Sequence, residues 1–383
     1  MTPTPLKQYL LTAGPTPVPE RVSLAMAHPI VFHRSVAFTE LLTEVLDGLR
    51  WVCQTQQPAV LLTATSGSGA MEAAITNFVS PGDTVLCIRG GRFGERWTNL
   101  CTAFGVKPIN LDVPWGQSID PAVVEAALRE HPEAKAVFCT ASESSTGVAH
   151  PVQAIARLCA GKDALCVVDA ISAIGAFDQP QDAWGIDVLV GASQKALMNP
   201  PGIGFFTMSE RAWTRAQQGT GPRFYFDVRK LKKSQDKGET TWTPPVTLLV
   251  GMREALRMMR QEGLEAIFAR HLQLAEATRQ ACAAIGCAPF AEGAPSPSVT
   301  AVKVPDGIDG SAVVQRMRSR WGVIISGGQE HLKGKIFRIA HMGYFGPFDV
   351  IVAVTALEMA LFEAGHRFEL GAGVRAAERV LLG

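Results

Sequence analysis

The chain alternates between short apolar runs and longer segments whose apolar residues recur every three to four positions. The short runs are typical of buried strands, and the longer segments are typical of helices with one buried face. Such alternation predicts a mainly parallel sheet covered by helices, with functional groups at the carboxyl ends of the strands. We expect strands over residues 59–63, 84–88, 106–111, 136–139, 164–169 and 188–192, and helices over residues 36–53, 71–79, 94–104, 121–130 and 151–159.

The pattern changes near residue 211. Residues 211–245 show a weaker pattern and include a lysine-rich stretch, so we expect an exposed excursion there. A smaller α/β unit then follows, with helices expected from residue 246 and over 264–285, 311–320 and 348–364, and strands over 298–304, 323–325 and 336–339. Five prolines in the first twenty residues indicate an extended arm rather than a regular element. We expect three parts: an N-terminal arm (1–15), a large domain (16–260) and a small C-terminal domain (261–383).

Composition narrows the class of protein. Lys and Arg total 36 and Asp and Glu 35, and no basic tract is present, which disfavours nucleic acid as a partner. The eight cysteines are scattered without a Cys-x-x-Cys pair, which argues against a metal site and against a disulfide scaffold. The N-terminus lacks the features of a signal peptide and no apolar run reaches membrane-spanning length, so we expect a cytoplasmic protein with no membrane partner.

Two strand ends carry the candidate chemistry. The apolar run from residue 188 ends at Lys195, and a lysine in apolar surroundings is costly unless its ammonium is paired or used chemically. Taken alone, Lys195 is better interpreted as a lysine at a strand end whose head reaches water. Another apolar strand, however, ends at Asp169. A lysine that bonds an aldehyde and an aspartate that holds a pyridinium nitrogen are the pair that pyridoxal phosphate chemistry needs.

Residues 65–70 form a second candidate site. This run of small residues follows a strand and opens directly into a helix, where free N–H groups and glycines suit a phosphate. It lacks the Gly-Lys-Ser/Thr of a P-loop and the third glycine of the dinucleotide fingerprint. A tight turn with a capping serine stays open as the structural alternative. The strand ends together gather five candidate residues: Gly69, Phe93, Ser144, Asp169 and Lys195.

Taken together, these stretches resemble the class V aminotransferases, a branch of the fold-type I pyridoxal-phosphate enzymes. Within that family the chain is most similar to the alanine–glyoxylate and serine–glyoxylate (or serine–pyruvate) aminotransferases. The resemblance covers nearly the whole chain and implies an α/β fold, with a seven-stranded, mainly parallel sheet in the large domain and a smaller C-terminal α/β domain. It rests on Gly14-Pro15-Thr16, Ser66-Gly67-Ser68-Gly69, Glu143-Ser144-Ser145-Thr146-Gly147, Val168-Asp169, residues 191–197 and Phe337-Arg338-Ile339.

The resemblance implies a role for each candidate. Lys195 would carry the cofactor and then move the α proton of the substrate, and Asp169 would keep the ring nitrogen protonated. Arg338 would grip the substrate carboxylate with two parallel hydrogen bonds. The other implied residues are Ser68, Gly69, Ala70 and Gln194 at the phosphate, Thr243 there from the second subunit of a homodimer, Phe93 stacked on the ring, Ser144 near its phenolic oxygen, Ile171 among the cofactor-binding residues, and Gly14 at the substrate.

Some positions depart from the family pattern. Phe93 stands where tryptophan is common, and Ala70 stands where relatives use a histidine or an aromatic residue. Thr240 aligns with a tyrosine that relatives offer to the phosphate. These departures leave the cofactor site intact but make the sequence less informative about the substrate. His33 and Arg34 are compatible both with the substrate mouth and with a solvated loop.

Three functions remain open. The first is a transaminase that moves the amino group of alanine or serine to glyoxylate or pyruvate by a ping-pong route. The second is another reaction on the same cofactor, with aspartate, phosphoserine or 2-aminoethylphosphonate as donor; a cysteine desulfurase is disfavoured because residues 324–331 contain no cysteine. The third is a non-catalytic accessory relative. It is disfavoured because a protein without catalytic activity would not need a buried lysine.

Overall fold

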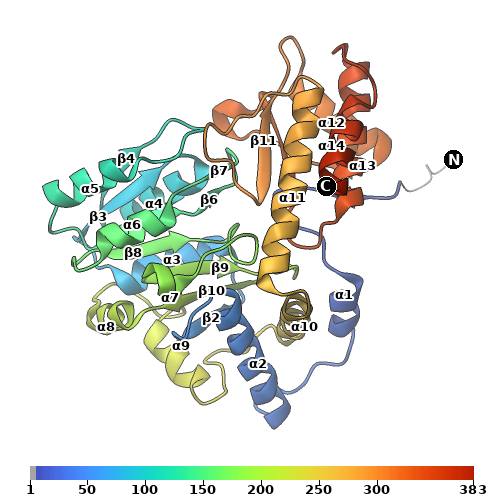
Figure 1. The fold of residues 1–383 in the computed structure, drawn as a ribbon. Coiled ribbons are helices and arrows are strands. Elements are labelled where there is room, and N and C mark those ends of the chain that lie inside the picture. Colours follow the sequence, from blue (N-terminus) through green and yellow to red (C-terminus); the bar gives the residue numbers. More distant parts are fainter. Residues whose placement is uncertain (1–5) are drawn as a thin grey trace.

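Two sheets of unequal size organise the chain in the computed structural model, which describes residues 6–383 (Figure 1). The larger sheet has seven strands with helices on both faces, and the smaller has three strands packed against C-terminal helices. The predicted α/β class with a large and a small unit is therefore confirmed. Residues 1–5 of the predicted arm lie outside the described residues, and the boundaries expected at residues 15 and 260 stay predictions.

The larger sheet is mainly parallel. The exception is β10, which runs antiparallel to both of its neighbours. All other pairings are parallel. In spatial order the strands are β2 (Ala59–Thr63), β10 (Ile203–Met208), β9 (Val188–Ala192), β8 (Leu165–Asp169), β5 (Ala136–Thr140), β3 (Thr84–Arg89) and β4 (Lys107–Asp112).

Strand side chains alternate between the two faces and feed two separate apolar cores. Along β9, Leu189 faces one core while Val188 and Val190 face the other. The first core is covered by α2 (Val36–Val52), α5 (Pro121–Glu130), α6 (Val152–Cys159) and α10 (Val246–Glu262). The second is covered by α3 (Gly67–Phe78), α4 (Arg92–Ala103), α8 (Glu210–Gln218) and α9 (Val228–Gln235), and the short α7 (Gln181–Trp184) follows β8.

The smaller unit has its own core. Its sheet has the order β11 (Val299–Lys303), β14 (Ile336–Ala340) and β13 (Ser326–Gly327), all antiparallel. Leu274, Met317, Phe337 and Leu357 are among its buried side chains. The helices are α11 (Leu264–Ala284), α12 (Gly310–Trp321), α13 (Pro347–Glu363) and α14 (Ala372–Leu382), with a 3-10 turn at Glu330–Leu332.

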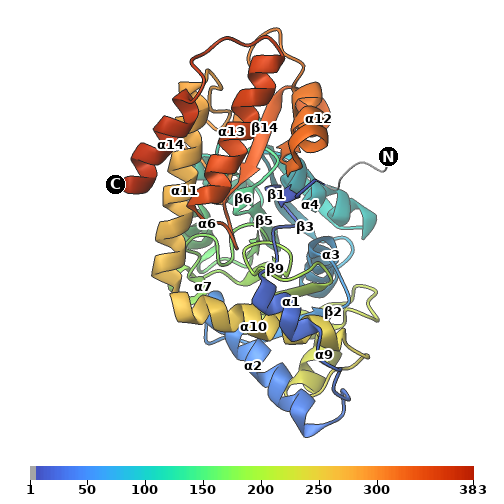
Figure 2. The same cartoon turned by 90° about the vertical axis from the view of Figure 1, so that its right-hand side faces the viewer.

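The N-terminal segment joins the two units. Its strand β1 (Tyr9–Leu10) pairs in parallel with β12 (Val323–Ile324) of the smaller unit. The next turn reaches the larger unit, where Thr16 donates its N–H to the carbonyl of Gln194 at 3.1 Å. Helix α1 (Glu20–Met26) then lies along α10 (Figure 2). The prediction of an arm without regular elements is therefore wrong at β1, and α1, which follows the arm, was not predicted.

Several other elements differ from the predictions. Residues 211–245 are not wholly an exposed excursion, because α8 and α9 lie there and bury one face against the second core. The strand expected at 323–325 pairs with β1 instead of joining the small sheet. Strand β10 and helix α14 were not expected. A two-stranded ladder of β6 (Ser142–Glu143) and β7 (Val148–Ala149) forms within the expected polar cluster.

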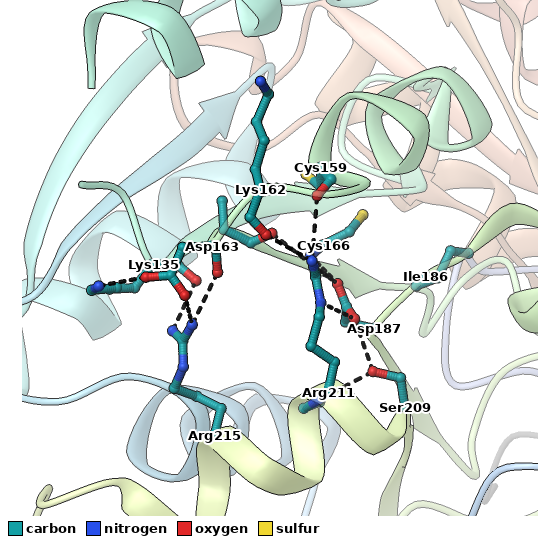
Figure 3. A network of polar contacts seen from close by, with 12 residues as sticks. Lys135, Cys159, Lys162, Asp163, Cys166, Ile186, Asp187, Ser209, Arg211 and Arg215 are labelled. Carbon is teal, nitrogen blue, oxygen red and sulfur yellow. Dashed lines mark hydrogen bonds and ion pairs between the residues drawn. The ribbon is translucent and has the colours of Figure 1, made fainter. Parts of the chain in front are cut away.

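A polar network fastens α8 to the strands (Figure 3). The buried carboxylate of Asp187, just before β9, accepts from Ser209 Oγ at 2.8 Å and from two nitrogens of Arg211. The Arg211 guanidinium also donates to the carbonyls of Lys162 and Ala164, each at 2.8 Å. One arginine thus satisfies a buried carboxylate and loop carbonyls together, which fixes the start of α8.

All eight cysteines are free and buried, as expected of small apolar side chains within a core. No helix within residues 6–383 has the combination of length and apolar character that crossing a membrane would require.

Candidate active site

The ends of β8 and β9 bring the two central residues together. These strands are adjacent and parallel, with Asp169 opposite Val190, so Asp169 and the turn that carries Lys195 meet at one edge of the sheet. A cavity of about 260 Å³ opens at this edge. It is lined by seven of the predicted site residues: Gly14, Ser68, Phe93, Asp169, Ile171, Gln194 and Lys195.

Burial shifts the protonation of both central groups. It raises the pKa of the Asp169 carboxyl to about 7, although that carboxylate accepts the N–H of Ile171 at 3.0 Å. Burial, together with the charge of Arg338, lowers the pKa of the Lys195 ammonium to about 8. A lysine of that pKa is readily available as a neutral nucleophile, and an aspartate shielded from water suits a cationic partner.

The N-terminal segment passes directly over Lys195. The lysine ammonium donates to the carbonyl of Ala13, and Thr16 Oγ1 donates to the Lys195 carbonyl at 2.8 Å. Gly14 lies between them with φ +133°, a conformation that glycine tolerates best. A Cβ at this position would clash with Lys195 Nζ. Gly14 therefore leaves the space that the lysine head occupies.

The start of α3 lies on another side of the cavity. The first-turn N–H groups of a helix have no partner inside the helix, and Ser68 and Gly69 occupy this turn. The N–H of Ala70, in contrast, donates to the Ser66 carbonyl at 3.1 Å, and its side chain is buried in the second core. Gln194 lines the cavity, and its side-chain oxygen is buried without a hydrogen-bond partner within residues 6–383.

The turn after β5 connects Phe93 with Arg338. The buried Glu143 carboxylate accepts from the N–H groups of Phe93 and Gly94, at 3.0 and 2.9 Å, and so holds the start of α4. The neighbouring Ser144 is buried, and its side chain does not line the cavity. Its carbonyl instead accepts from Arg338 Nη1 at 2.8 Å. Burial raises the pKa of the Glu143 carboxyl.

Arg338 stands on β14 of the smaller sheet and is almost fully buried. Besides Ser144, it donates from Nε to the carbonyl of Gly327 at 2.8 Å. Its Nη2 group donates to no acceptor within residues 6–383, which leaves this nitrogen available to a ligand. The guanidinium is thus held in one orientation by two backbone carbonyls.

The predicted residue Thr243 lies elsewhere in this chain, as do His33 and Arg34, whose role the sequence left open. Thr243 and His33 line a separate surface hollow of about 550 Å³ beside Ile30 and Phe32. Arg34 forms an exposed ion pair with Glu239 at 2.8 Å. None of the three lines the Lys195 cavity.

Among the cavity residues that were not predicted from the sequence, Arg96 is the charged one within residues 6–383. Arg96 lies one helical turn after Phe93, so both side chains project from the same face of α4. It lines the cavity, and its Nη1 donates to Ser68 Oγ at 2.8 Å. The three-residue spacing from Phe93 was the available signal.

Comparisons with known proteins agree with this geometry. The chain is 44% identical over 380 residues to the small subunit of soluble hydrogenase from Synechococcus sp. strain PCC 6716, which covers 98% of both chains. It is 35% identical to the serine–glyoxylate aminotransferase of Methylorubrum extorquens (99% of this chain, 97% of the relative). It is also 35% identical to the L-aspartate–glyoxylate aminotransferase of Paracoccus denitrificans (95% and 94%).

Among solved structures, the ureidoglycine–glyoxylate aminotransferase of Bacillus subtilis superposes with a TM-score of 0.93, at 30% identity and over the full length of both chains. The model of the family "Aminotransferase class-V" matches residues 8–342, which include the strand ends, the lysine turn and Arg338. The resemblance inferred from the motifs is confirmed, and with it the fold-type I architecture. The chain belongs to the class-V aminotransferase family.

Proposed function

We propose that the protein is a pyridoxal-phosphate-dependent aminotransferase that moves the amino group of alanine or serine to glyoxylate or pyruvate by a ping-pong route. The observation that carries the proposal is the placement of Lys195 and Asp169 at adjacent strand ends in one cavity. Relatives over the full length of the chain carry the names of glyoxylate aminotransferases, which supports the acceptor.

The residues present fit the cofactor. When bound, pyridoxal phosphate supplies an aldehyde that takes up the amino group and a ring that accepts the electron pair freed at Cα. Asp169 would hold the protonated ring nitrogen, and Phe93 would cover one face of the ring. The first turn of α3, with Ser68 and Gly69, would hold the phosphate, with Gln194 beside it.

The reaction itself would rest on two basic residues, Lys195 as a neutral amine and Arg338 as a cation. Lys195, once its nitrogen is released, would take the α proton of the substrate and return it on the cofactor side. Arg338 would bind the substrate carboxylate through its free Nη2, since Ser144 and Gly327 already fix its other nitrogens. This orientation determines which bond at Cα is broken.

We further propose a homodimer with a shared site, in which Thr243 of one subunit reaches the phosphate of the other. Thr243 does not line the cavity of its own chain. It lies in a hollow beside Ile30 and Phe32, whose side chains are 68% and 66% exposed. Exposed apolar side chains that lie together in one hollow are compatible with an interface. The cytoplasmic location expected from the sequence stays a prediction.

The test is a visible absorption spectrum of the purified protein, followed by addition of L-alanine and then L-serine without acceptor. We expect a yellow protein that bleaches with one of these donors. Bleaching only with aspartate, phosphoserine or 2-aminoethylphosphonate would keep the reaction class and change the donor. A protein that stays colourless in excess cofactor would contradict the proposal and favour the non-catalytic alternative. Lys195→Ala should abolish turnover in a protein that still folds.

The hydrogenase name of the Synechococcus relative does not supply a second candidate function. Within residues 6–383, no group of three or more His, Cys, Asp or Glu side chains is placed to hold a metal ion. The eight cysteines lie inside the apolar cores or against them. No arrangement of side chains within residues 6–383 therefore favours that activity over amino transfer.

A further inference from the structure

The cavity has an excess of positive charge. Lys195 and Arg96 line it and Arg338 lies beside it, whereas Asp169 is the one carboxylate in its lining. The nearby Glu143 carboxylate is occupied by backbone N–H groups of α4. Lys195 and Arg338 have roles in the proposed reaction, one at the aldehyde and one at the substrate carboxylate. Arg96 has none.

Arg96 is held at the phosphate end of the cavity. Its guanidinium carbon lies 4.8 Å from the centroid of the Phe93 ring, and Nη1 donates to Ser68 Oγ at 2.8 Å. Ser68 belongs to the first turn of α3. The arginine therefore spans from the ring-stacking residue to the turn that would hold the phosphate.

The guanidinium of Arg96 has no direct carboxylate partner within residues 6–383, although Asp169 lies near enough for the two charges to interact. No Asp or Glu oxygen within residues 6–383 lies within 4.0 Å of its guanidinium, and its hydrogen-bond acceptor is a neutral hydroxyl. Other partly buried arginines of the chain differ: Arg211 contacts the carboxylate of Asp187, and Arg223 lies near that of Asp227. A half-buried guanidinium without a carboxylate is costly unless an anion from outside the protein completes it.

We propose that Arg96 acts with Ser68 to recognise the cofactor phosphate, so that the chain selects the phosphorylated cofactor over its unphosphorylated form. This inference rests on the proposed function. Ala70 offers no polar side chain at this turn and its N–H is already bonded, which leaves Arg96 as the cation at this end of the cavity. An arginine suits a phosphate because its planar fork matches two phosphate oxygens.

The test compares two probes, pyridoxal phosphate and pyridoxal, which share the ring and the aldehyde and differ in the phosphate. Their dissociation constants are measured by visible absorption on cofactor-free protein. Arg96→Ala should weaken binding of pyridoxal phosphate by about 10- to 100-fold, the range for loss of one charge-assisted hydrogen bond, and leave pyridoxal unchanged. Arg96→Lys should retain part of the preference.

Arg92→Ala is the matched control. Arg92 lies on the same helix and pairs with Glu330 at 3.2 Å, outside the cavity lining. This variant should keep the preference for the phosphorylated probe. Circular dichroism of each variant checks the fold, and Arg96→Lys keeps the test valid if Arg96→Ala unfolds.

Two results would overturn the inference. Equal weakening of both probes in the Arg96 variants would mean that the arginine only supports Phe93. An unchanged ratio of the two dissociation constants would mean that it does not contact the phosphate. A failure of the proposed function is distinct, because the unaltered protein would then give a visible band with neither probe.

Discussion

At the scale of single residues, the site keeps its ionisable groups in unfavourable surroundings. Asp169 and Lys195 are both shifted by burial toward their neutral forms, and the neighbouring Arg338 adds repulsion to the lysine. A cofactor with a cationic ring nitrogen would relieve the aspartate. These local costs in stability prepare the site for its ligand.

The lysine should therefore react at moderate pH. The neutral amine is the nucleophile, so the rate at which cofactor-free protein takes up pyridoxal phosphate should rise with pH with a midpoint of about 8. Stopped-flow absorption at a series of pH values measures this rate. Arg338→Met, which removes the neighbouring charge, should move the midpoint upward. A midpoint near the ordinary lysine value of 10.5 would contradict the burial of Lys195.

Asp169 should destabilise the cofactor-free protein above neutral pH. Its pKa is about 7 when folded and 3.8 ordinarily, so the folded state keeps a proton that the unfolded chain releases between these values. The stability that this group contributes is present below pH 4 and is lost as pH rises through 7, a change on the order of 4 kcal/mol. Asp169→Asn should raise the free energy of unfolding at pH 8, measured in urea, with a smaller difference at pH 5. An equal difference at both pH values would refute this.

Gly14 should tolerate no side chain. Gly14→Ala places a Cβ against Lys195 Nζ, and the resulting shift of the lysine should lower turnover by about 100-fold. Gly202→Ala is the matched control, because its φ of +137° carries similar strain while its Cβ would meet only the end of the Leu248 side chain. Comparable losses in both variants would point to backbone strain rather than to the lysine.

At the scale of elements, the sequence best predicted the helices and strands that have a clear hydrophobic period and short connections to their neighbours. Strands 59–63 and 188–192 appear with the expected bounds, because both are buried along their whole length. Strand β10 was missed because it runs antiparallel and follows a Pro-Pro-Gly turn, which interrupts the alternation of strands and helices. Helices α8 and α9 were missed because mostly charged residues flank the few that they bury.

For the site, the strand ends identified Lys195 and Asp169 from their own residues, and the family motifs supplied most of the rest. Arg96 escaped because an arginine on a charged helix resembles a solvated one until its distance from Ser68 is known. The sequence and structure of one chain do not reveal the contact of Thr243, because the phosphate that it is proposed to bind belongs to another copy of the chain. Contacts between distant segments and between subunits leave no periodic mark on a sequence.

The network around Arg211 should hold α8 to the sheet. Arg211→Ala leaves the buried Asp187 carboxylate with fewer partners, and the free energy of unfolding should fall by about 2–3 kcal/mol. Arg215→Ala on the same helix is the control: its partner Asp163 is half exposed, so the loss should stay below about 1 kcal/mol (Figure 3). Urea unfolding of both variants measures the contrast, and equal losses would assign no special role to the buried pair.

At the scale of the whole molecule, the site belongs to neither unit alone. Arg338 comes from the smaller sheet, yet the larger unit holds it through the carbonyl of Ser144. The N-terminal segment adds a third part by covering Lys195. Any relative movement of the two units would therefore change the distance between the lysine and the arginine.

A hybrid of two inactive variants should test the shared site. Lys195→Ala lacks the amine, and Thr243→Glu places a negative charge where we expect the partner's phosphate. In a mixed dimer, one of the two sites would combine an intact lysine with an intact threonine. Random mixing should therefore restore about one quarter of the activity. If Thr243 acts within its own chain, the mixture should stay inactive.

The N-terminal segment also sets when the site is completed during synthesis. The N–H of Ala13 donates to Ser326 Oγ, a residue 313 positions later, and β1 pairs with β12. During translation, Ala13 and Gly14 therefore leave the ribosome long before the residues that hold them in place have been synthesised. A growing chain that has already folded its large sheet still lacks a fastened cover over Lys195. The growing chain can therefore fasten this cover over Lys195 only after residue 326 has been synthesised.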